Sequence, residues 1–340
     1  GRMSGSLART NVLGNMLFGS LSCSPVAAAA AIGGVMGPLQ KKEGYDPKFS
    51  AAANIASAPT GLIIPPTGAL IIYSLVSGGT SVAALFLAGY IPGILWGLAC
   101  MLVIFMHARR YKLPVSERVT FKVGLKTFID AIPSLLLIVI VIGGILGGIF
   151  TATEASAVAV AYCLMLSFIY RTIKIKDLPR IILESAEITS VIMLLVAASS
   201  VMSWVMAFTG IPNAISELIL SISDNPIVLL LIINVFLLFI GTFMDLTPAI
   251  LIFTPIFLPI VLTLGMDPIH FGIMLVMNLS IGNITPPVGS ALFVGASIAK
   301  LKIEDVIKPM IPFYIVIIIV LLLVSYIPAL SMWLPNIAGY

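Results

Sequence analysis

Two proline pairs, each followed by a glycine, are the residues of this chain that point most directly to chemistry. Pro286-Pro287-Val288-Gly289 lies between Pro268 and Ala299, a stretch without Asp, Glu, Lys or Arg. A stretch of that length is typical of a membrane-embedded helix. A proline, however, lacks an N–H group, and its ring collides with the carbonyl four residues earlier. A break at membrane depth is tolerated only where it is buried in protein or lines a polar cavity, so it is a candidate binding site.

The same break occurs twice along the chain. Pro65-Pro66-Thr67-Gly68 lies 221 residues earlier, and the turns Gly44-Tyr45-Asp46-Pro47 and Gly265-Met266-Asp267-Pro268 match at the same offset. Upstream, Pro25 and Pro248 each follow a short polar stretch. Each repeat therefore predicts a re-entrant hairpin with a polar tip, a Gly-x-Asp-Pro turn and a broken helix. Such a pair of interrupted apolar segments indicates a transporter site.

The composition sets the class of protein. The 340 residues are 60% hydrophobic and 9% charged, which is typical of an integral membrane protein. The apolar stretches are too long and too unbroken for β-barrel strands, which alternate, so we expect an all-α fold. The net charge of +4 predicts no nucleic-acid partner, because the basic residues lie between spans. The three cysteines give neither a disulfide framework nor a metal-binding spacing.

The order of the apolar stretches predicts four parts. We expect a first hairpin and broken helix in residues 1–80 and their counterparts in residues 225–300, which together form a transport domain. Residues 81–224 would hold connecting and scaffold helices with a basic, cytoplasmic amphipathic segment at His107–Lys126, and residues 301–340 a terminal scaffold helix. Because the chain begins Gly1-Arg2, we expect it to be a fragment that lacks upstream helices.

The basic residues predict the orientation of the two repeats. If five crossings separate the two hairpins, all 18 Lys and Arg residues fall on one face, as the positive-inside rule requires of the cytoplasmic side. The opposite face would carry Glu154, Glu217, Asp224 and Asp267. Five is an odd number, so the two repeats are inverted relative to each other, as in secondary transporters. The 18 residues are Arg2, Arg9, Lys41, Lys42, Lys48, Arg109, Arg110, Lys112, Arg118, Lys122, Lys126, Arg171, Lys174, Lys176, Arg180, Lys300, Lys302 and Lys308.

Several motifs along the whole chain resemble those of one family. The chain is similar to the large membrane subunit of tripartite ATP-independent periplasmic (TRAP) transporters, and it looks most like the sialic-acid members. The motifs that carry the resemblance are Phe18-Gly19-Ser20-Leu21-Ser22, the alanine run Ala27–Gly33, Gly61-Leu62-Ile63-Ile64-Pro65-Pro66, Leu85-Phe86-Leu87-Ala88-Gly89-Tyr90-Ile91-Pro92-Gly93, Gly148-Ile149-Phe150-Thr151-Ala152-Thr153-Glu154-Ala155 and Gly282-Asn283-Ile284-Thr285-Pro286-Pro287-Val288-Gly289.

This resemblance implies a function and its partners. It implies sodium-driven import of a small organic acid, of the sialic-acid or C4-dicarboxylate type, across the bacterial inner membrane by a multi-pass protein. The acid would be delivered by a periplasmic substrate-binding protein, and a small four-helix membrane subunit, separate or fused, would flank the chain. Transport would follow an elevator motion. The first hairpin tip departs from the family pattern, because Cys23 replaces the usual glycine between Ser22 and Ser24.

Oxygen atoms at the tips and breaks could bind the coupling ion, Na⁺. Such ions are bound by carbonyl and hydroxyl groups at the ends of half-helices. Asp245 lies near the middle of an apolar run, where a carboxylate indicates a functional site; the alternative is that it caps the return arm of the hairpin, and both roles can hold. We predict a first sodium site of Ser22, Ser24, Gly61 and Pro65, and a second of Gly241, Thr242, Asp245, Asn283, Thr285 and Pro286.

The same half-helix ends could bind the acid. Helix N-termini carry partial positive charge and free N–H groups that attract a carboxylate, and no basic residue lies in either broken segment around the proline pairs. We expect the two tips and two breaks to converge near the midplane of the membrane. The residues predicted to contact the substrate are Ser24, Thr67, Thr285 and Gly289.

Two other classes of function fit the sequence less well. The first is an ion or solute channel without a coupled gradient, which the inverted hairpins and the absence of a ring-forming filter motif disfavour. The second is an intramembrane aspartyl protease, whose chemistry needs two carboxylates that share a proton. Asp245 has no second mid-membrane aspartate to pair with, so the sequence predicts that the protein is not an enzyme.

Overall fold

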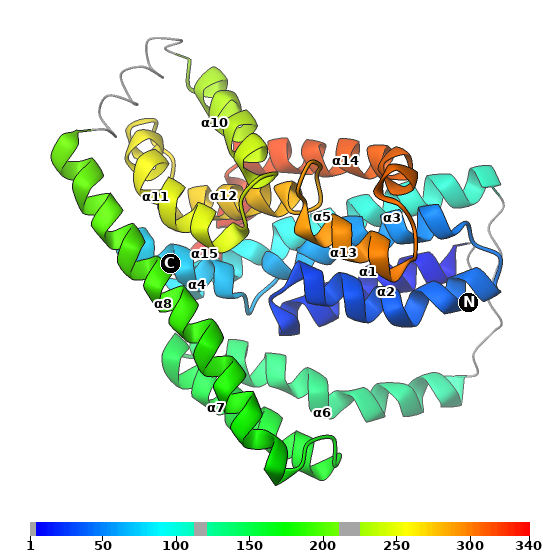
Figure 1. The fold of residues 1–340 in the computed structure, drawn as a ribbon. Helices are drawn as coiled ribbons and strands as arrows, with labels where there is room; N and C mark the ends of the chain where they lie inside the picture. Colours follow the sequence, from blue (N-terminus) through cyan, green and yellow to red (C-terminus); the bar gives the residue numbers. More distant parts are fainter. Residues whose placement is uncertain (1–4, 112–120, 211–224) are drawn as a thin grey trace. The chain divides into compact units, whose positions relative to one another are not determined.

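The computed structural model describes residues 5–111, 121–210 and 225–340. In that part of the chain every regular element is an α-helix or a short 3-10 helix (Figure 1), which confirms the all-α fold. The chain divides into two compact units, Gly1–Arg118 with Gly210–Tyr340 and Val119–Thr209. The first unit contains both hairpins and both broken helices. Glu217 and Asp224, expected on the face opposite the basic residues, lie outside the described residues.

The first repeat begins with the predicted hairpin. Its tip at Cys23-Ser24 separates two helices, and the proline pair separates two more. In chain order the elements are α1 (Ser6–Ser22), α2 (Pro25–Lys42), α3 (Pro47–Ser57), the 3-10 helix η1 (Ala58–Leu62) and α4 (Gly68–Val76).

The second repeat follows the same order of elements. Its tip covers residues 242–245 and its break residues 283–289. The Gly-x-Asp-Pro turns also match, because Asp46 and Asp267 each cap the next helix: their carboxylates accept hydrogen bonds from the backbone N–H groups of Lys48 at 3.1 Å and Ile269 at 2.7 Å. The elements are α10 (Pro226–Gly241), α11 (Leu246–Thr263), α12 (Pro268–Gly282) and α13 (Ser290–Ile298).

The second half of each broken helix packs against the other repeat. Helix α13 contacts α2 and α3, and α4 contacts α11 and α12 in the same way (Figure 1). Glycines permit both approaches: a side chain at Gly295 would collide with Ile55, and one at Gly272 with the ring of Tyr73. The Tyr73 hydroxyl also donates a hydrogen bond to the Pro268 carbonyl at 2.6 Å. The two repeats are therefore interlocked.

Helix α5 (Val82–Tyr111) packs along the first repeat. Its glycines at four-residue spacing, Gly89, Gly93 and Gly97, face the segment at Ile63-Ile64 and the side chain of Met16, as small residues do where membrane helices approach closely. The expected amphipathic segment differs: His107 to Tyr111 continue α5, Lys122 to Lys126 belong to α6, and residues 112–120 lie outside the described part.

The expected terminal span is two helices, α14 (Ile303–Tyr326) and α15 (Ala329–Ile337). Pro328 explains the difference, because a proline lacks the N–H group that would continue α14 and pushes the residue before it out of helical geometry. Ile327 accordingly has φ −119° and ψ 88°. Both helices, together with α5, lie in the same compact unit as the hairpins, whereas the sequence grouped them with the scaffold. Which parts move remains a prediction.

The second unit consists of α6 (Phe121–Leu146), α7 (Ala152–Ile169), η2 (Ile175–Asp177) and α8 (Leu178–Thr209). Thr151 and Glu154 form a capping box at the start of α7, since the Thr151 side chain accepts from the Glu154 N–H and the Glu154 carboxylate accepts from the Thr151 N–H. Tyr162 of α7 donates a hydrogen bond to the Pro133 carbonyl of α6 at 2.7 Å.

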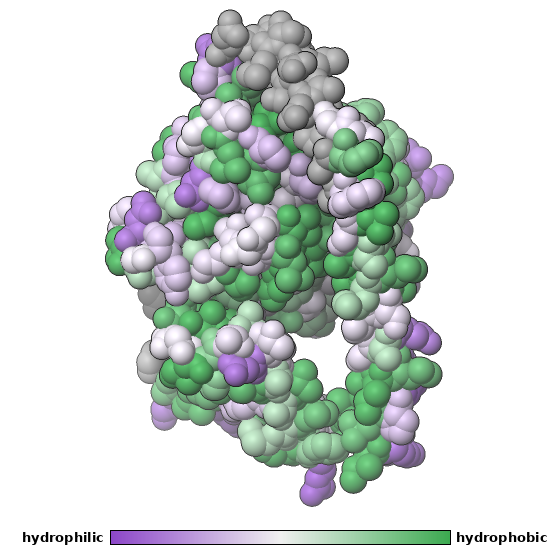
Figure 2. All heavy atoms as spheres, turned by 90° about the vertical axis from the view of Figure 1, so that its left-hand side faces the viewer, coloured by the Kyte–Doolittle hydropathy of each residue, from purple (hydrophilic) through white to green (hydrophobic). Residues whose placement is uncertain are grey.

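Six helices of the described part are long and apolar enough to cross a membrane. Large apolar side chains of these helices, such as Val139, Val160 and Leu194, are exposed, and hydrophobic residues cover much of the face shown in Figure 2. Water-facing surfaces do not hold apolar patches of that size, so these helices suit contact with lipid. The six are Val82–Tyr111, Lys122–Leu146, Ala152–Ile169, Ile175–Met206, Leu246–Thr263 and Ile303–Tyr326.

Candidate functional site

The first hairpin tip is built around Cys23. Its backbone is left-handed, with φ 51° and ψ 22°, a conformation that glycine adopts without strain. The Cys23 thiol donates to the Pro66 carbonyl at 3.3 Å, so the tip contacts the proline break. Ser24 caps α2, because its Oγ accepts from the Ala27 N–H at 3.2 Å, and the Ser22 hydroxyl donates to the Ser24 carbonyl at 3.4 Å.

Two glycines allow the first tip and the first break to meet. Gly19 of α1 and Gly61 of η1 cross so closely that a Cβ at Gly19 would lie 2.8 Å from the Gly61 Cα. Pro65 precedes a cis peptide bond to Pro66. Thr67 is buried and its hydroxyl is engaged, since it donates to the Leu62 carbonyl at 2.9 Å and accepts from the Ala69 N–H. Thr67 therefore helps to close the break, and its contact with the substrate remains a prediction.

The second tip repeats the glycine crossing. A Cβ at Gly241 of α10 would lie 3.2 Å from the Gly282 Cα of α12. The Thr242 hydroxyl donates to the Phe239 carbonyl at 2.7 Å, which leaves the lone pairs of its oxygen available. Asp245 occupies the N-cap position of α11, but its exposed side chain makes no capping hydrogen bond. The structure thus gives Asp245 the position of a cap without the bond that defines one.

The second break is held at both ends. The Asn283 carbonyl accepts from the Ala291 N–H at 3.1 Å, and its side-chain oxygen accepts from the Ser290 hydroxyl. Thr285 donates to the Ile281 carbonyl at 2.7 Å. Pro286 precedes a second cis bond, and Gly289 has φ 37°, in the left-handed region that favours glycine.

Each tip therefore lies against its own break, and we call each such tip and break together a module. The two repeats meet because η1 contacts α12. The predicted sodium ligands Ser22, Ser24, Gly61 and Pro65 fall in the first module, and the remaining six fall in the second. Across the described residues no group of three or more His, Cys, Asp and Glu side chains could hold a metal ion. The oxygens present are carbonyl, hydroxyl, amide and a single carboxylate, a set that suits a hard monovalent cation.

Two buried amide clusters beside the modules were not predicted from the sequence. In the first repeat, Asn15 Nδ2 donates to Asn54 Oδ1 at 3.0 Å and to Ser57 Oγ at 2.8 Å. In the second, Asn278 Nδ2 donates to Asn234 Oδ1 at 2.8 Å. Ser57 and Asn278 are related by the 221-residue offset, whereas Asn54 corresponds to Leu275, so a comparison of the repeats would have pointed to one member of each cluster and not to its partners.

We predict that glycine at position 23 is tolerated and valine is not. The left-handed backbone costs about 1–2 kcal/mol for a residue with a Cβ, and a β-branched side chain adds to that strain. Cys23→Gly should unfold at a temperature equal to or above that of the wild type, and Cys23→Val at a lower one. Thermal unfolding in detergent measures this, with Cys163→Ala in α7 as control. Equal stability of the glycine and valine variants would contradict the conformational argument.

Comparison with known proteins identifies the family. The sequence model described as "Tripartite ATP-independent periplasmic transporter, DctM component" matches residues 1–330. The chain is 57% identical to the uncharacterised protein YgiK of Salmonella typhimurium over 99% of this chain and 78% of that protein. It is 39% identical to the C4-dicarboxylate TRAP transporter large permease protein DctM of Pseudomonas aeruginosa, over 100% and 79%. It is 36% identical to the sialic acid TRAP transporter large permease protein SiaM of Vibrio cholerae, over 100% and 80%. The chain belongs to the DctM family, the large membrane component of the tripartite ATP-independent periplasmic transporters.

Proposed function

We propose that this chain couples the import of a small organic acid to the entry of sodium ions across the bacterial inner membrane. It would receive the acid from a periplasmic binding protein, beside a small four-helix membrane subunit, and would carry out no chemical conversion. The names of two relatives, a C4-dicarboxylate permease and a sialic acid permease, support an acid as the cargo. The observation that carries the proposal is the packing of each hairpin tip on its own proline break.

This packing brings opposite helix ends together. In the second module α10 and α12 end, at Gly241 and Gly282, where α11 and α13 begin, after Asp245 and Gly289. The C-terminal ends present carbonyl oxygens of partial negative charge, and the N-terminal ends present N–H groups of partial positive charge. One module therefore offers ligands for a cation and for an anion, as in transporters with discontinuous helices.

The proximity of the two kinds of helix end gives a mechanism for coupling. A sodium ion bound by carbonyls and hydroxyls would neutralise the carboxylate of the acid, and the attraction between unit charges is stronger in a low-dielectric site than in water. Binding of one would then raise the affinity for the other by the same factor. The predicted ligands of both modules include no positively charged side chain, so bound sodium would supply the positive charge that the acid needs.

An elevator motion is the proposed means of exposing the site to each side in turn. The interlocking of α4 and α13 with the opposite repeats supports movement of the two hairpins as one body. Residues Val119–Thr209 form a separate compact unit and are the part of the described chain proposed to belong to the fixed scaffold.

Sodium coupling is tested by substituting the second tip. Asp245→Asn removes a carboxylate and Thr242→Ala a hydroxyl, and each should raise the sodium concentration for half-maximal uptake about tenfold, equivalent to about 1.4 kcal/mol of sodium binding. Uptake of radiolabelled acid is measured in proteoliposomes that contain the complete transporter with its binding protein, under an inward sodium gradient or with choline instead.

The matched control for this test is Asp130→Asn, which removes an exposed carboxylate from α6 and should leave the sodium dependence unchanged. If wild-type uptake proceeds equally in choline, sodium coupling is wrong. If the protein conducts ions without acid or binding protein, it is a channel. If only Asp245→Asn has no effect, the Asp245 carboxylate only helps to position α11, and the ion is bound by the remaining oxygens.

A further inference from the structure

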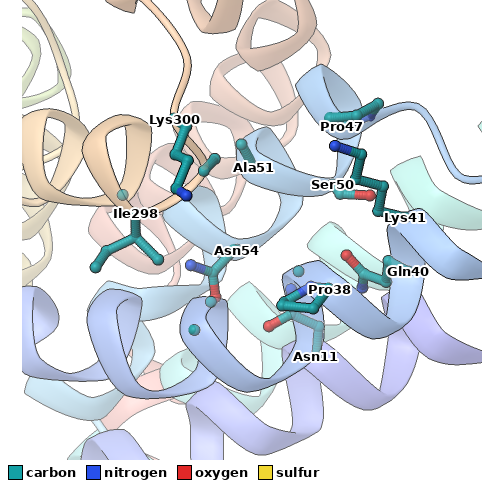
Figure 3. A pocket seen from close by; sticks show the side chains of 15 residues that line it. Asn11, Pro38, Gln40, Lys41, Pro47, Ser50, Ala51, Asn54, Ile298 and Lys300 are labelled. Atoms are coloured by element: carbon teal, nitrogen blue, oxygen red, sulfur yellow. The ribbon is translucent and has the colours of Figure 1, made fainter.

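A cavity of about 250 Å³ lies between α2, α3 and α13, apart from the tips and breaks (Figure 3). On α2 it extends from Gly33 to Lys41. At 1.5 Å per residue, Gly33 lies about 14 Å along the helix from Ser24, and Gln40 about 24 Å. The cavity therefore opens near the basic end of the hairpin, at the base of its return arm.

Two buried polar side chains of this cavity have oxygen atoms without a hydrogen-bond partner. Gln40 is 0% exposed; its Nε2 donates to the Leu7 carbonyl at 3.3 Å, whereas its Oε1 is unpaired. Ser50 is 6% exposed, and its Oγ is also unpaired. A buried polar group left unpaired destabilises the fold. Oε1 of Gln40 can only accept a hydrogen bond, so it requires a donor such as a hydroxyl group.

Two lysines line the same cavity. Lys41, at the end of α2, and Lys300, just after α13, are drawn on different sides of it in Figure 3. Both are exposed, and none of the residues that line the cavity is acidic. The two ammonium groups favour a carboxylate at the mouth and disfavour a cation in this cavity.

The polar lining is not required by the fold, because the second repeat lacks it. At the 221-residue offset, Gln40, Ser50 and Asn54 correspond to Val261, Phe271 and Leu275. All three of these apolar side chains are 0% exposed. The ring of Tyr73, from α4 of the first repeat, packs against Gly272 in this part of the second repeat. The same architecture is thus stable with an apolar interior at these positions.

We propose that this cavity is a second binding site for the transported acid and that it selects an acid carrying hydroxyl groups. The inference rests on the proposed function. The carboxylate would lie between Lys41 and Lys300, and hydroxyl groups would donate to Gln40 Oε1 and pair with Ser50 Oγ. The volume lies below the usual range of about 300–1,000 Å³ for pockets that take drug-sized ligands, and it suits a small hydroxylated acid. An acid leaving the tips would be held here before its release.

Binding of D-gluconate to the full chain in lipid nanodiscs tests this site. Affinities are measured by isothermal titration in choline buffer. Without sodium, the proposed site at the tips should bind the acid only weakly. We expect hexanoate, which has the carboxylate but no hydroxyl groups, to bind at least tenfold more weakly than gluconate. Gln40→Leu should weaken the binding of gluconate at least tenfold and leave the binding of hexanoate unchanged. The double variant Lys41→Gln with Lys300→Gln should weaken the binding of both acids.

A second variant tests the cavity by filling it. A Cβ at Gly37 meets no atom within 4 Å, so Gly37→Leu should fill space in the cavity without displacing backbone and should abolish gluconate binding. Gly124→Leu in α6, where a Cβ is equally unopposed, is the control. Equal gluconate affinity in wild type, Gln40→Leu and Gly37→Leu would overturn the site and show that water alone pairs Gln40 and Ser50. Failure of the proposed function would show separately, as sodium-independent uptake by the wild type.

Discussion

Replacing Gly282 or Gly61 by alanine is expected to reduce acid uptake at least tenfold. The new Cβ at Gly282 would collide with the backbone of Gly241, and that at Gly61 with the backbone of Gly19. Overpacking a dense interior costs about 1–3 kcal/mol, and a backbone neighbour cannot turn aside as a side chain can. The tip must therefore move away from its break, which separates the two sets of proposed ligands. Uptake into proteoliposomes and the sodium concentration for half-maximal uptake measure the effect.

The chain offers a matched control in the first break. Gly68 begins α4, and a Cβ there would meet no atom within 4 Å, so Gly68→Ala should transport at the wild-type rate. The partner glycines should show smaller effects, because a Cβ would lie 3.2 Å from its nearest neighbour at Gly241 and 2.8 Å at Gly19. Wild-type uptake by Gly282→Ala and Gly61→Ala would show that the close crossings are not needed for transport.

The second large effect is expected on stability, at Asn54. This buried side chain donates to the Ala29 carbonyl of α2 at 2.8 Å and accepts from Asn15 Nδ2 of α1 at 3.0 Å, so it joins three helices. Asn54→Ala removes both bonds, each worth about 0.5–1.5 kcal/mol, and leaves an unfilled space between the three helices, which adds to the loss. We expect a loss of about 2 kcal/mol or more in the free energy of unfolding, measured by thermal or denaturant unfolding in detergent.

Asn336→Ala is the control, since Asn336 is an exposed amide in α15 and its loss should change stability little. A similar small effect of both substitutions would mean that water replaces the Asn54 contacts.

The parts of the fold that were predicted correctly depend on local chemistry. The breaks follow from the missing N–H groups of the proline pairs, and the turns from Asp46 and Asp267 beside a proline. Each is decided within a few residues, so the sequence shows both the element and its boundary. The interruption at Pro328 follows the same rule, but the apolar residues on either side of it concealed the break.

The features that were not predicted depend on contacts between distant residues. Asn15 and Asn54 are 39 residues apart and Asn234 and Asn278 are 44 apart, and nothing near either residue in the sequence indicates its partner. The cavity at Gln40 and Ser50 also requires α13 to pack beside α2. The roles of the tip residues in binding sodium and acid remain predictions, because they concern ions and not the packing of the chain.

The exchange of α4 and α13 between the repeats has a consequence for biosynthesis and ancestry. During translation, the surface of α2 and α3 that includes Gly33 and Ile55 lacks its covering helix until α13 emerges. Neither repeat is therefore expected to fold stably as a separate fragment. An ancestor with a single repeat would have completed its packing only as an antiparallel, domain-swapped dimer, and fusion of the two copies would have made that partnership permanent.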